Sequence, residues 1–335
     1  MTDPFPLGKL PPAVLADILA RVPASDPRII VGPRVGEDAA VLDLGGEDYL
    51  VAKTDPITFA TEEIGWYAVH VNANDIAAAG GTPAFFMATV LLPGGSADRE
   101  MVEHIFEQMS AACKMLNISL VGGHTEITHG LDRPIVAGTM FGLAPRDRLI
   151  TTGGARPGDR LLLTKGFPIE ATAIIAREKA GMLAARFSEG FVSRCAEYLH
   201  DPGISVVPDA RTALRAGVVH AMHDPTEGGV ATGLWEIARA SGVQLHVDLR
   251  PSLLEDAAHV CSAVGIDPLG AIASGSLLLA APSEAVTPIL QAFAEAGIAA
   301  FEIGSVEAGE ASVIERETGK PLRLPERDEI ARLFE

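Results

Sequence analysis

Four short polar segments in the first half of the chain interrupt apolar stretches and carry side chains suited to metal and phosphate chemistry. In chain order they are Gly36-Glu37-Asp38, Thr54-Asp55, Asn72-Ala73-Asn74-Asp75 and Gly122-Gly123-His124-Thr125-Glu126. Mg²⁺ takes oxygen ligands and commonly binds through a few carboxylates together with the phosphates of a substrate. Together the segments indicate a site for a magnesium-bound phosphate group, although the first two could each be a simple acidic turn.

Asp75 is the most informative of these residues. The helix predicted over 64–79 consists mainly of Val, Ala, Ile and aromatic residues, and Asn72 and Asp75 share one of its faces because they are three positions apart. A carboxylate buried there needs a partner, since an unpaired buried charge is costly. We favour a metal ion as that partner. The structural alternative is a network of hydrogen bonds between the helix and a loop.

Two of the segments follow predicted strands. Asp55 comes after a strand predicted over 49–53, and α/β proteins often place ligands at such strand ends. Gly122 and Gly123 end a strand predicted over 118–121. The glycines permit close approach of the backbone, and the side chains that follow them can coordinate or donate hydrogen bonds.

The second half contributes one candidate segment, His223-Asp224-Pro225-Thr226. It leads from a predicted strand into a predicted helix, so the backbone amides at that helix N-terminus can face phosphate. The structural alternative is that Thr226 or Asp224 only caps the helix. The phosphate-binding patterns GxxxxGK[ST] and GxGxxG are both absent from the sequence, so a nucleotide must be bound in another way.

The elements that must position these residues alternate between strand and helix, which indicates a mixed α/β fold. Helices are predicted over 13–21, 64–79, 98–116, 170–179, 189–199, 227–240, 253–264 and 283–296, and strands over 49–53, 85–92, 118–121, 134–143, 160–164, 218–222, 243–247 and 276–281. A turn-rich stretch over 151–159 separates two patterned halves. With 335 residues, we expect two domains, at 1–150 and 151–335.

The composition limits which classes of partner the protein can bind and indicates its cellular compartment. The net charge of -18 has the wrong sign for binding nucleic acid or an anionic membrane. The three cysteines are far apart and form no CxxC pair, which argues against a disulfide framework and a cysteine zinc site. The N-terminus, Met1-Thr2-Asp3-Pro4, lacks the basic segment and following apolar run that are typical of a signal peptide. No stretch of the sequence is apolar enough to span a bilayer. We therefore expect a cytoplasmic protein.

Six motifs in this order resemble the aminoimidazole ribonucleotide synthetase superfamily, over nearly the whole chain. They are Gly36-Glu37-Asp38-Ala39-Ala40, Thr54-Asp55, Asn74-Asp75-Ile76-Ala77-Ala78-Ala79-Gly80, Gly122-Gly123-His124-Thr125, Arg156-Pro157-Gly158-Asp159 and Asp224-Pro225-Thr226-Glu227-Gly228-Gly229. The resemblance implies a homodimer in which N-terminal domains pair into a barrel whose cleft holds ATP and Mg²⁺. Asp224-Pro225-Thr226 before the glycine pair, with Glu236-Ile237-Ala238, is most similar to the hydrogenase-maturation carbamoyl dehydratases (HypE).

The same resemblance implies roles for individual residues. The expected magnesium ligands are Asp38, Asp55 and Asp75. Residues expected to contact the nucleotide are Asn74, Gly122, Gly123, Thr125 and Thr226. Asp75, Asp224 and His124 are the expected catalytic side chains. His124 stands where these dehydratases usually have an acid, and histidine is a poorer magnesium ligand, so the number of metal ions stays open.

The implied activity is ATP-dependent phosphoryl transfer to an unidentified acceptor, either a small molecule or a protein-borne group. The sequence ends at Ile330-Ala331-Arg332-Leu333-Phe334-Glu335, without the terminal cysteine that carries the carbamoyl group in HypE, so we expect a different acceptor. One alternative is a kinase for a small metabolite, similar to thiamine-monophosphate kinase. Another is a nucleotide-binding scaffold that assembles with a maturation partner protein and turns over little ATP.

Overall fold

The computed structural model describes residues 5, 7–22, 25–34 and 36–335. The expectation based on Met1-Thr2-Asp3-Pro4 concerns residues outside these ranges. Across the described ranges, no helix combines the length and the apolar character needed to cross a membrane.

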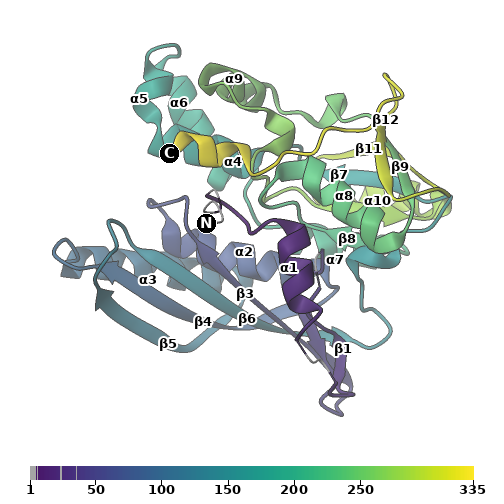
Figure 1. Cartoon of the computed structure of the whole chain (residues 1–335), viewed down its shortest axis with the longest axis horizontal. Helices are drawn as coiled ribbons and strands as arrows, with labels where there is room; N and C mark the ends of the chain where they lie inside the picture. Colours follow the sequence, from purple (N-terminus) through teal and green to yellow (C-terminus); the bar gives the residue numbers. More distant parts are fainter. Residues whose placement is uncertain (1–4, 6, 23–24, 35) are drawn as a thin grey trace.

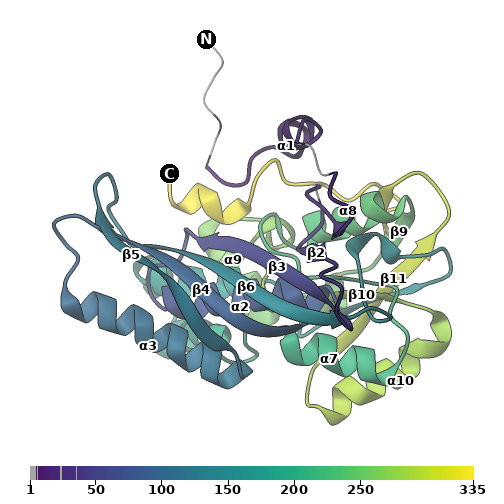
Figure 2. The same cartoon turned by 90° about the horizontal axis from the view of Figure 1, so that it is seen from below.

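A six-stranded sheet forms the first half of the chain, with strands in the order β1-β2-β3-β6-β4-β5. The strands are β1 Ile29–Val31, β2 Ala40–Leu42, β3 Asp48–Ile57, β4 Thr82–Pro93, β5 Ser119–Thr128 and β6 Ile135–Pro145. Pairing is antiparallel except between β4 and β5, which run parallel because helix α3 (Arg99–Leu116) connects them. Figure 2 shows the outer face of this sheet, across which no helix of the described chain runs.

Helix α2 (Ile64–Ala78) covers the inner face of this sheet and separates it from the second half of the chain (Figure 1). Nearly all its residues are buried, since the sheet lies on one side and helix α7 (Val207–Ala216) on the other. It lies close to β6 because two glycines of that strand lack side chains. A Cβ at Gly138 would lie 2.4 Å from Asn72 Nδ2, and one at Gly142 would lie 2.3 Å from a methyl carbon of Ile76.

The second half contains another six-stranded sheet, in the order β12-β9-β11-β7-β10-β8. Its strands are β7 Arg160–Thr164, β8 Ala221–His223, β9 Gln244–Val247, β10 Leu278–Ala281, β11 Ala300–Glu307 and β12 Ser312–Glu315. Besides α7, the helices of the second half are α4 Ile169–Glu178, α5 Ala180–Ala184, α6 Glu189–Ala196, α8 Gly229–Ser241, α9 Glu255–Val264 and α10 Ser283–Glu295. Helix α1 (Pro12–Leu19) lies near the start of the chain. The expected mixed α/β class with two sheet-containing halves is confirmed.

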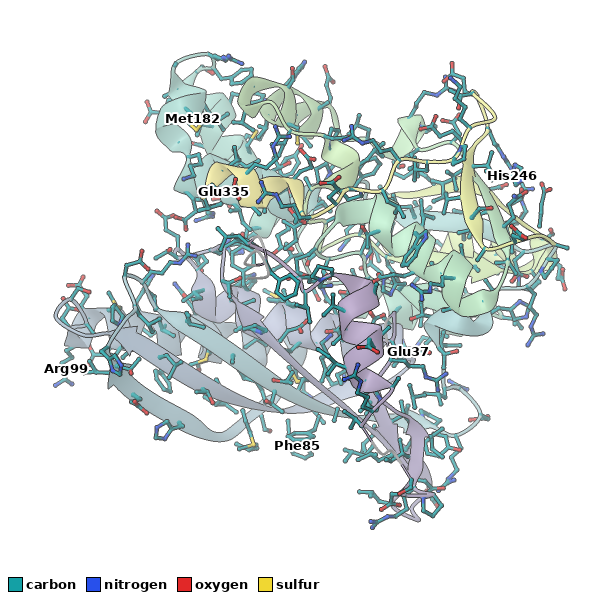
Figure 3. The ribbon with its side chains drawn as sticks, in the orientation of Figure 1. Glu37, Phe85, Arg99, Met182, His246 and Glu335 are labelled. Carbon is teal, nitrogen blue, oxygen red and sulfur yellow. The ribbon has the colours of Figure 1, made fainter. Side chains whose placement is uncertain are left out.

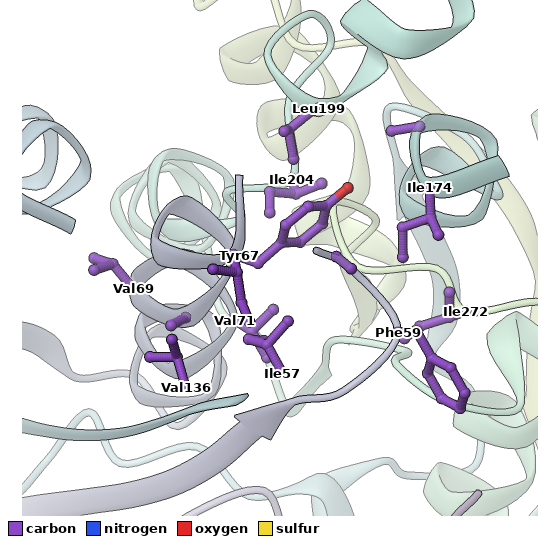
Figure 4. Packing of buried hydrophobic residues seen from close by; sticks show 14 of the residues in the cluster. Ile57, Phe59, Tyr67, Val69, Val71, Val136, Ile174, Leu199, Ile204 and Ile272 are labelled. Carbon is purple, nitrogen blue, oxygen red and sulfur yellow. The ribbon is translucent and has the colours of Figure 1, made fainter. Parts of the chain in front are cut away.

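One apolar core is shared by both halves. Figure 4 shows Tyr67 of α2 among Ile174, Leu199 and Ile204, which come from the second half. The two sheets lie on either side of the turn-rich residues 151–159. The domain limits 1–150 and 151–335 stay a prediction, because this shared core ties α4, α6 and α9 to the first half.

Two local predictions were wrong. The glycine pair does not end a strand, since β5 continues through Gly122 and Gly123 to Thr128. A Cβ at Gly123 would lie 2.0 Å from Ala88 O of β4, so this glycine allows close pairing of the two strands. Likewise β3 does not end at Lys53 but runs to Ile57, so Asp55 lies inside the strand.

Candidate functional site

Three aspartates from different elements meet between the two halves of the chain. Asp38 lies in the turn before β2, Asp75 in the last turn of α2, and Asp224 directly after β8. One carboxylate oxygen from each can be chosen so that all three atoms lie within 4.8 Å of one another. Asp75 and Asp224 are only 2% and 1% exposed, so this cluster is screened from solvent on most sides.

Burial makes the ionised forms of these acids costly. It raises the pKa of Asp75 well above its ordinary value and, with the nearby charge of Asp38, raises the pKa of Asp224 to about 7. Within the part of the chain that the structure describes, Asp75 Oδ2 and both carboxylate oxygens of Asp224 have no hydrogen-bond partner. Buried polar atoms are nearly always satisfied in folded proteins, so these oxygens indicate that a cation or ligand belongs here.

Lys53 is a site residue that the sequence analysis missed. Its Nζ lies 3.2 Å from Asp55 Oδ2 and 3.1 Å from Asp75 Oδ2, and both contacts are ion pairs. Burial would lower the pKa of Lys53, but Asp75 and Asp55 outweigh this effect and raise it well above its ordinary value. The signal in the sequence was the Lys-Thr-Asp spacing, because residues two apart on a strand share a face.

His223 and Glu236 were also missed, although both lie inside quoted motifs. His223 Nδ1 lies 2.6 Å from Asp38 Oδ2, and its Nε2 lies 2.8 Å from Glu236 Oε2. Burial would lower the pKa of His223, but these two carboxylates raise it well above its ordinary value. A protonated imidazole ring donates a hydrogen bond from each nitrogen. His223 therefore links Asp38 of the first half to Glu236 of helix α8 through two charge-assisted hydrogen bonds.

The two asparagines of α2 take part in hydrogen bonds between the helix and other segments, which was the alternative to a metal ion. Asn72 Oδ1 accepts a hydrogen bond from Asp55 N at 2.9 Å, and Asn72 Nδ2 donates to Ala68 O. Asn74 Nδ2 donates to Ile204 O, and its Oδ1 accepts from Val206 N, both at 2.8 Å. Such a network accounts for the asparagines but not for Asp75. A nucleotide contact by Asn74 stays a prediction.

The start of α8 does not match the capping alternative, and whether its amides face phosphate stays a prediction. Its N-cap is Gly228, and in the described chain no side chain, neither that of Thr226 nor that of Asp224, caps the helix by a hydrogen bond. Gly228 N donates to Asp328 Oδ2 at 2.6 Å, so a carboxylate near the end of the chain takes this amide. Thr226 Oγ1 accepts a hydrogen bond from Lys9 Nζ at 3.2 Å, and Lys9 forms an ion pair with Glu227.

A pocket of about 330 Å³ is lined by two of the three aspartates, Asp38 and Asp75. Asp38, Lys53 and Asp75 lie on its N-terminal side, Thr226 on its C-terminal side, and Lys9 lies over it. Figure 3 places Glu37, another lining residue, beside α1. This volume is within the range of small-molecule sites.

The β5 residues are not part of this cluster within one chain. Gly122, Gly123, His124 and Thr125 are exposed on the outermost strand, and His124 Nε2 lies 3.3 Å from Glu126 Oε2. In the sheet, β6 and β4 separate β5 from β3, which amounts to about 14 Å at the usual strand spacing. Their expected roles at the nucleotide stay predictions.

Comparison with known proteins identifies the family. The model of the AIR synthase related protein N-terminal domain matches residues 36–144, and that of the C-terminal domain matches residues 156–316. Carbamoyl dehydratase HypE of Azotobacter vinelandii is 31% identical over 78% of this chain and 75% of its own. Selenide, water dikinase of Dechloromonas aromatica (strain RCB) is 32% identical over 72% of this chain and 67% of its own.

Solved structures agree with this assignment. The hydrogenase maturation protein HypE in complex with ATP has a TM-score of 0.71 and 26% identity, and the match covers 92% of each chain. The two family models together span most of the sequence, and they follow each other in the same order as the two sheets. The chain therefore belongs to the AIR synthase related protein family.

Proposed function

We propose that the chain binds ATP with Mg²⁺ in the pocket between its halves and transfers a phosphoryl group to an acceptor that is not yet identified. The observation that carries this proposal is the convergence of Asp38, Asp75 and Asp224 within 4.8 Å. The similar HypE of known structure was solved with ATP, and the similar selenide, water dikinase is a phosphoryl-transfer enzyme by its name. These relatives favour catalysis over a scaffold that only binds nucleotide.

The donor set fits magnesium. Three carboxylate oxygens are hard ligands of the kind that Mg²⁺ prefers, and two of the three acids have oxygens left without a hydrogen-bond partner in the described chain. The pocket is lined by four basic and seven acidic side chains, so a polyphosphate cannot enter without additional positive charge. Bound Mg²⁺ would supply neutralisation of charge on the transferred group.

The residues of the chain position the nucleotide. Asp38, held by His223, and Asp75 and Asp224, held by burial, form a fixed set of ligands that needs little rearrangement on binding. Lys9 and Lys53 both line this pocket and bring two ammonium groups to it. Positioning and electrostatic stabilisation of this kind account for most of the catalysis in phosphoryl transfer.

The acceptor is a separate molecule or a group on a partner protein, such as a maturation factor. All three cysteines of the chain are buried, and burial raises the pKa of Cys113 to about 11 and those of Cys195 and Cys261 to about 12. Thiols in this state are poor nucleophiles, so none of the three is placed to carry an acyl or carbamoyl group.

The chain acts as a homodimer through the outer face of the first sheet. Phe85 and Met87 of β4 are 47% and 37% exposed, and Leu143 of β6 is 46% exposed. Figure 3 shows Phe85 projecting from the sheet away from the second half. Edge strand β5 is exposed along its length, and exposed sheet edges and apolar faces of this kind are typical pairing surfaces.

Calorimetry with a non-hydrolysable ATP analogue, with and without Mg²⁺, tests the binding step. We expect magnesium-dependent binding by the wild type and none by Asp224→Asn. ADP release from ATP is then measured with the protein alone and with candidate small acceptors. Turnover that needs a small acceptor would favour the kinase alternative. Binding without turnover under any condition would favour the scaffold, and absence of binding would contradict the proposal.

A further inference from the structure

Lys53 occupies an unusual position for a residue of a metal-binding site. It lies on β3 two residues before Asp55, so both side chains point to the face of the strand that α2 covers. Its side chain is 18% exposed, and its Nζ lies within 3.2 Å of one oxygen of Asp55 and one of Asp75. A single ammonium group therefore joins acids from β3 and α2, two of the three residues expected to bind magnesium.

Lys53 Nζ lies where a second divalent ion bound by both Asp55 and Asp75 would have to lie. Oxygen ligands around one Mg²⁺ lie at about 2.0–2.1 Å, which places them roughly 3–4 Å from each other. Asp38, Asp75 and Asp224, with oxygens within 4.8 Å, come close to that arrangement. A second ion in a two-metal site lies about 3.5–4 Å from the first and shares carboxylates with it. An ion bridging Asp75 and Asp55 would have to displace Lys53.

We propose that Lys53 is a built-in cation that takes the place of a second metal ion and binds the terminal phosphate of the nucleotide directly. One divalent ion enters per protomer, at Asp38, Asp75 and Asp224, and Asp55 stays paired with Lys53. The position of Lys53 on the lining of the pocket gives its ammonium group access to a bound phosphate. This inference rests on the proposed function, because it assigns a role within the same nucleotide site.

Counting bound metal tests the inference without measuring activity. Mn²⁺ replaces Mg²⁺ as the probe, and the number of ions per protomer is measured by electron paramagnetic resonance with a saturating non-hydrolysable ATP analogue. We expect one ion per protomer in the wild type and in Lys53→Arg, which keeps the charge. Lys53→Met removes the charge at similar length, so we expect two ions per protomer. Its affinity for the analogue at low Mn²⁺ falls at least tenfold and recovers at high Mn²⁺.

Lys114→Met, at an exposed position of α3, is the matched control and should bind one ion with unchanged affinity. Two ions in the wild type would overturn the inference without any variant. An equal count in the wild type and Lys53→Met would also overturn it, while leaving the proposed function intact. If the wild type bound no analogue at all, the proposed function and this inference would both fail.

Discussion

His223 Nδ1 lies 2.6 Å from Asp38 Oδ2 and joins a loop of the first half to the end of β8 in the second. Both side chains are largely buried, and Glu236 holds the other ring nitrogen at 2.8 Å. The pair fixes one candidate metal ligand and also connects the two halves across the pocket. The stability of the protein and its binding of nucleotide should therefore both depend on His223.

His223→Gln should destabilise the protein, because Asp38 and Glu236 would lose the charge that compensates them. Breaking a buried ionic contact costs about 3 kcal/mol in the free energy of unfolding. The folded pKa of His223 is raised, so its contribution is fully present below its unfolded pKa of about 6.5 and is lost as pH rises through the folded value. Urea unfolding at several pH values should show the largest difference from wild type at pH 6 and a smaller one at high pH.

His104→Gln provides the comparison, since His104 is exposed on α3 and its substitution should leave the unfolding free energy within about 0.5 kcal/mol of wild type. A His223→Gln protein as stable as wild type at pH 6 would show that the ring is not charged in the folded state.

Asp75→Asn should abolish magnesium-dependent nucleotide binding while the protein still folds. The carboxylate meets Lys53 and the candidate metal position, and its neighbours on α2 pack as before. Titration with the ATP analogue should show a loss of affinity greater than tenfold, or about 1.4 kcal/mol. Asp147→Ala, at an exposed position, is the control. An Asp75→Asn affinity within about threefold of wild type would remove Asp75 from the site.

The sequence indicated the acids of the candidate site better than it indicated the residues that hold them. Asp75 stood out because a charge inside an apolar helix needs a partner, and its burial at 2% exposure agrees with that reasoning. Lys53 and His223 could not be found in the same way. Lys53 lies two positions from Asp55, but its contact with Asp75 and the contact of His223 with Asp38, 185 positions away, each join separate elements. Periodicity reports local structure and is silent about such pairs.

The predictions of strands and helices were wrong where contacts between distant segments override the local sequence pattern. The glycine pair 122–123 predicts the end of a strand, yet β5 continues because close pairing with β4 requires a residue without a side chain at Gly123. Strands β1, β2, β11 and β12 and helices α5 and α7 lie outside all the predicted ranges. Their segments are short or mixed in polarity, and β12 is defined mainly by its parallel pairing with β9.

Glu170→Gln should stabilise the protein at alkaline pH. Glu170 is 3% exposed, and burial raises its pKa from 4.5 to about 8. Between these values the unfolded chain releases the proton while the folded protein retains it, so wild-type stability falls as pH rises from about 4.5 to 8. The amide keeps the shape without the charge. Thermal unfolding should show a higher midpoint for the variant at pH 8 and nearly equal midpoints at pH 4.

The exposed Glu103 of α3 offers a control, since Glu103→Gln should change the unfolding free energy by less than about 0.5 kcal/mol at either pH. Equal effects of Glu170→Gln at pH 4 and pH 8 would contradict the raised pKa.

All three cysteines should be unreactive in the folded protein. Cys113 is 3% exposed, and Cys195 and Cys261 are fully buried at 0%, so a thiol reagent has neither access nor a thiolate to attack. With an aromatic disulfide reagent at pH 8, we expect slow reaction of the native protein and rapid reaction of all three thiols in denaturant. One equivalent reacting rapidly in the native state would identify an accessible cysteine and reopen the question of a carrier thiol on this chain.

Phe85→Asp should convert the proposed dimer into a monomer, because it places a charge at the centre of the exposed apolar face of the first sheet. Light scattering at micromolar concentration should give twice the mass of 35.0 kDa for the wild type and the single mass for the variant. Met182→Asp is the matched control, since Met182 is 49% exposed but lies on α5, far from that face (Figure 3), and this variant should remain dimeric.

Nucleotide binding measured on the same samples shows whether the site is completed across the dimer or within one chain. If the residues of β5 reach the nucleotide only across the dimer, the Phe85→Asp monomer should bind the ATP analogue at least tenfold more weakly. A wild-type monomer that binds the analogue fully would show that one chain completes its own site, and that His124 and the glycine pair take no part in it.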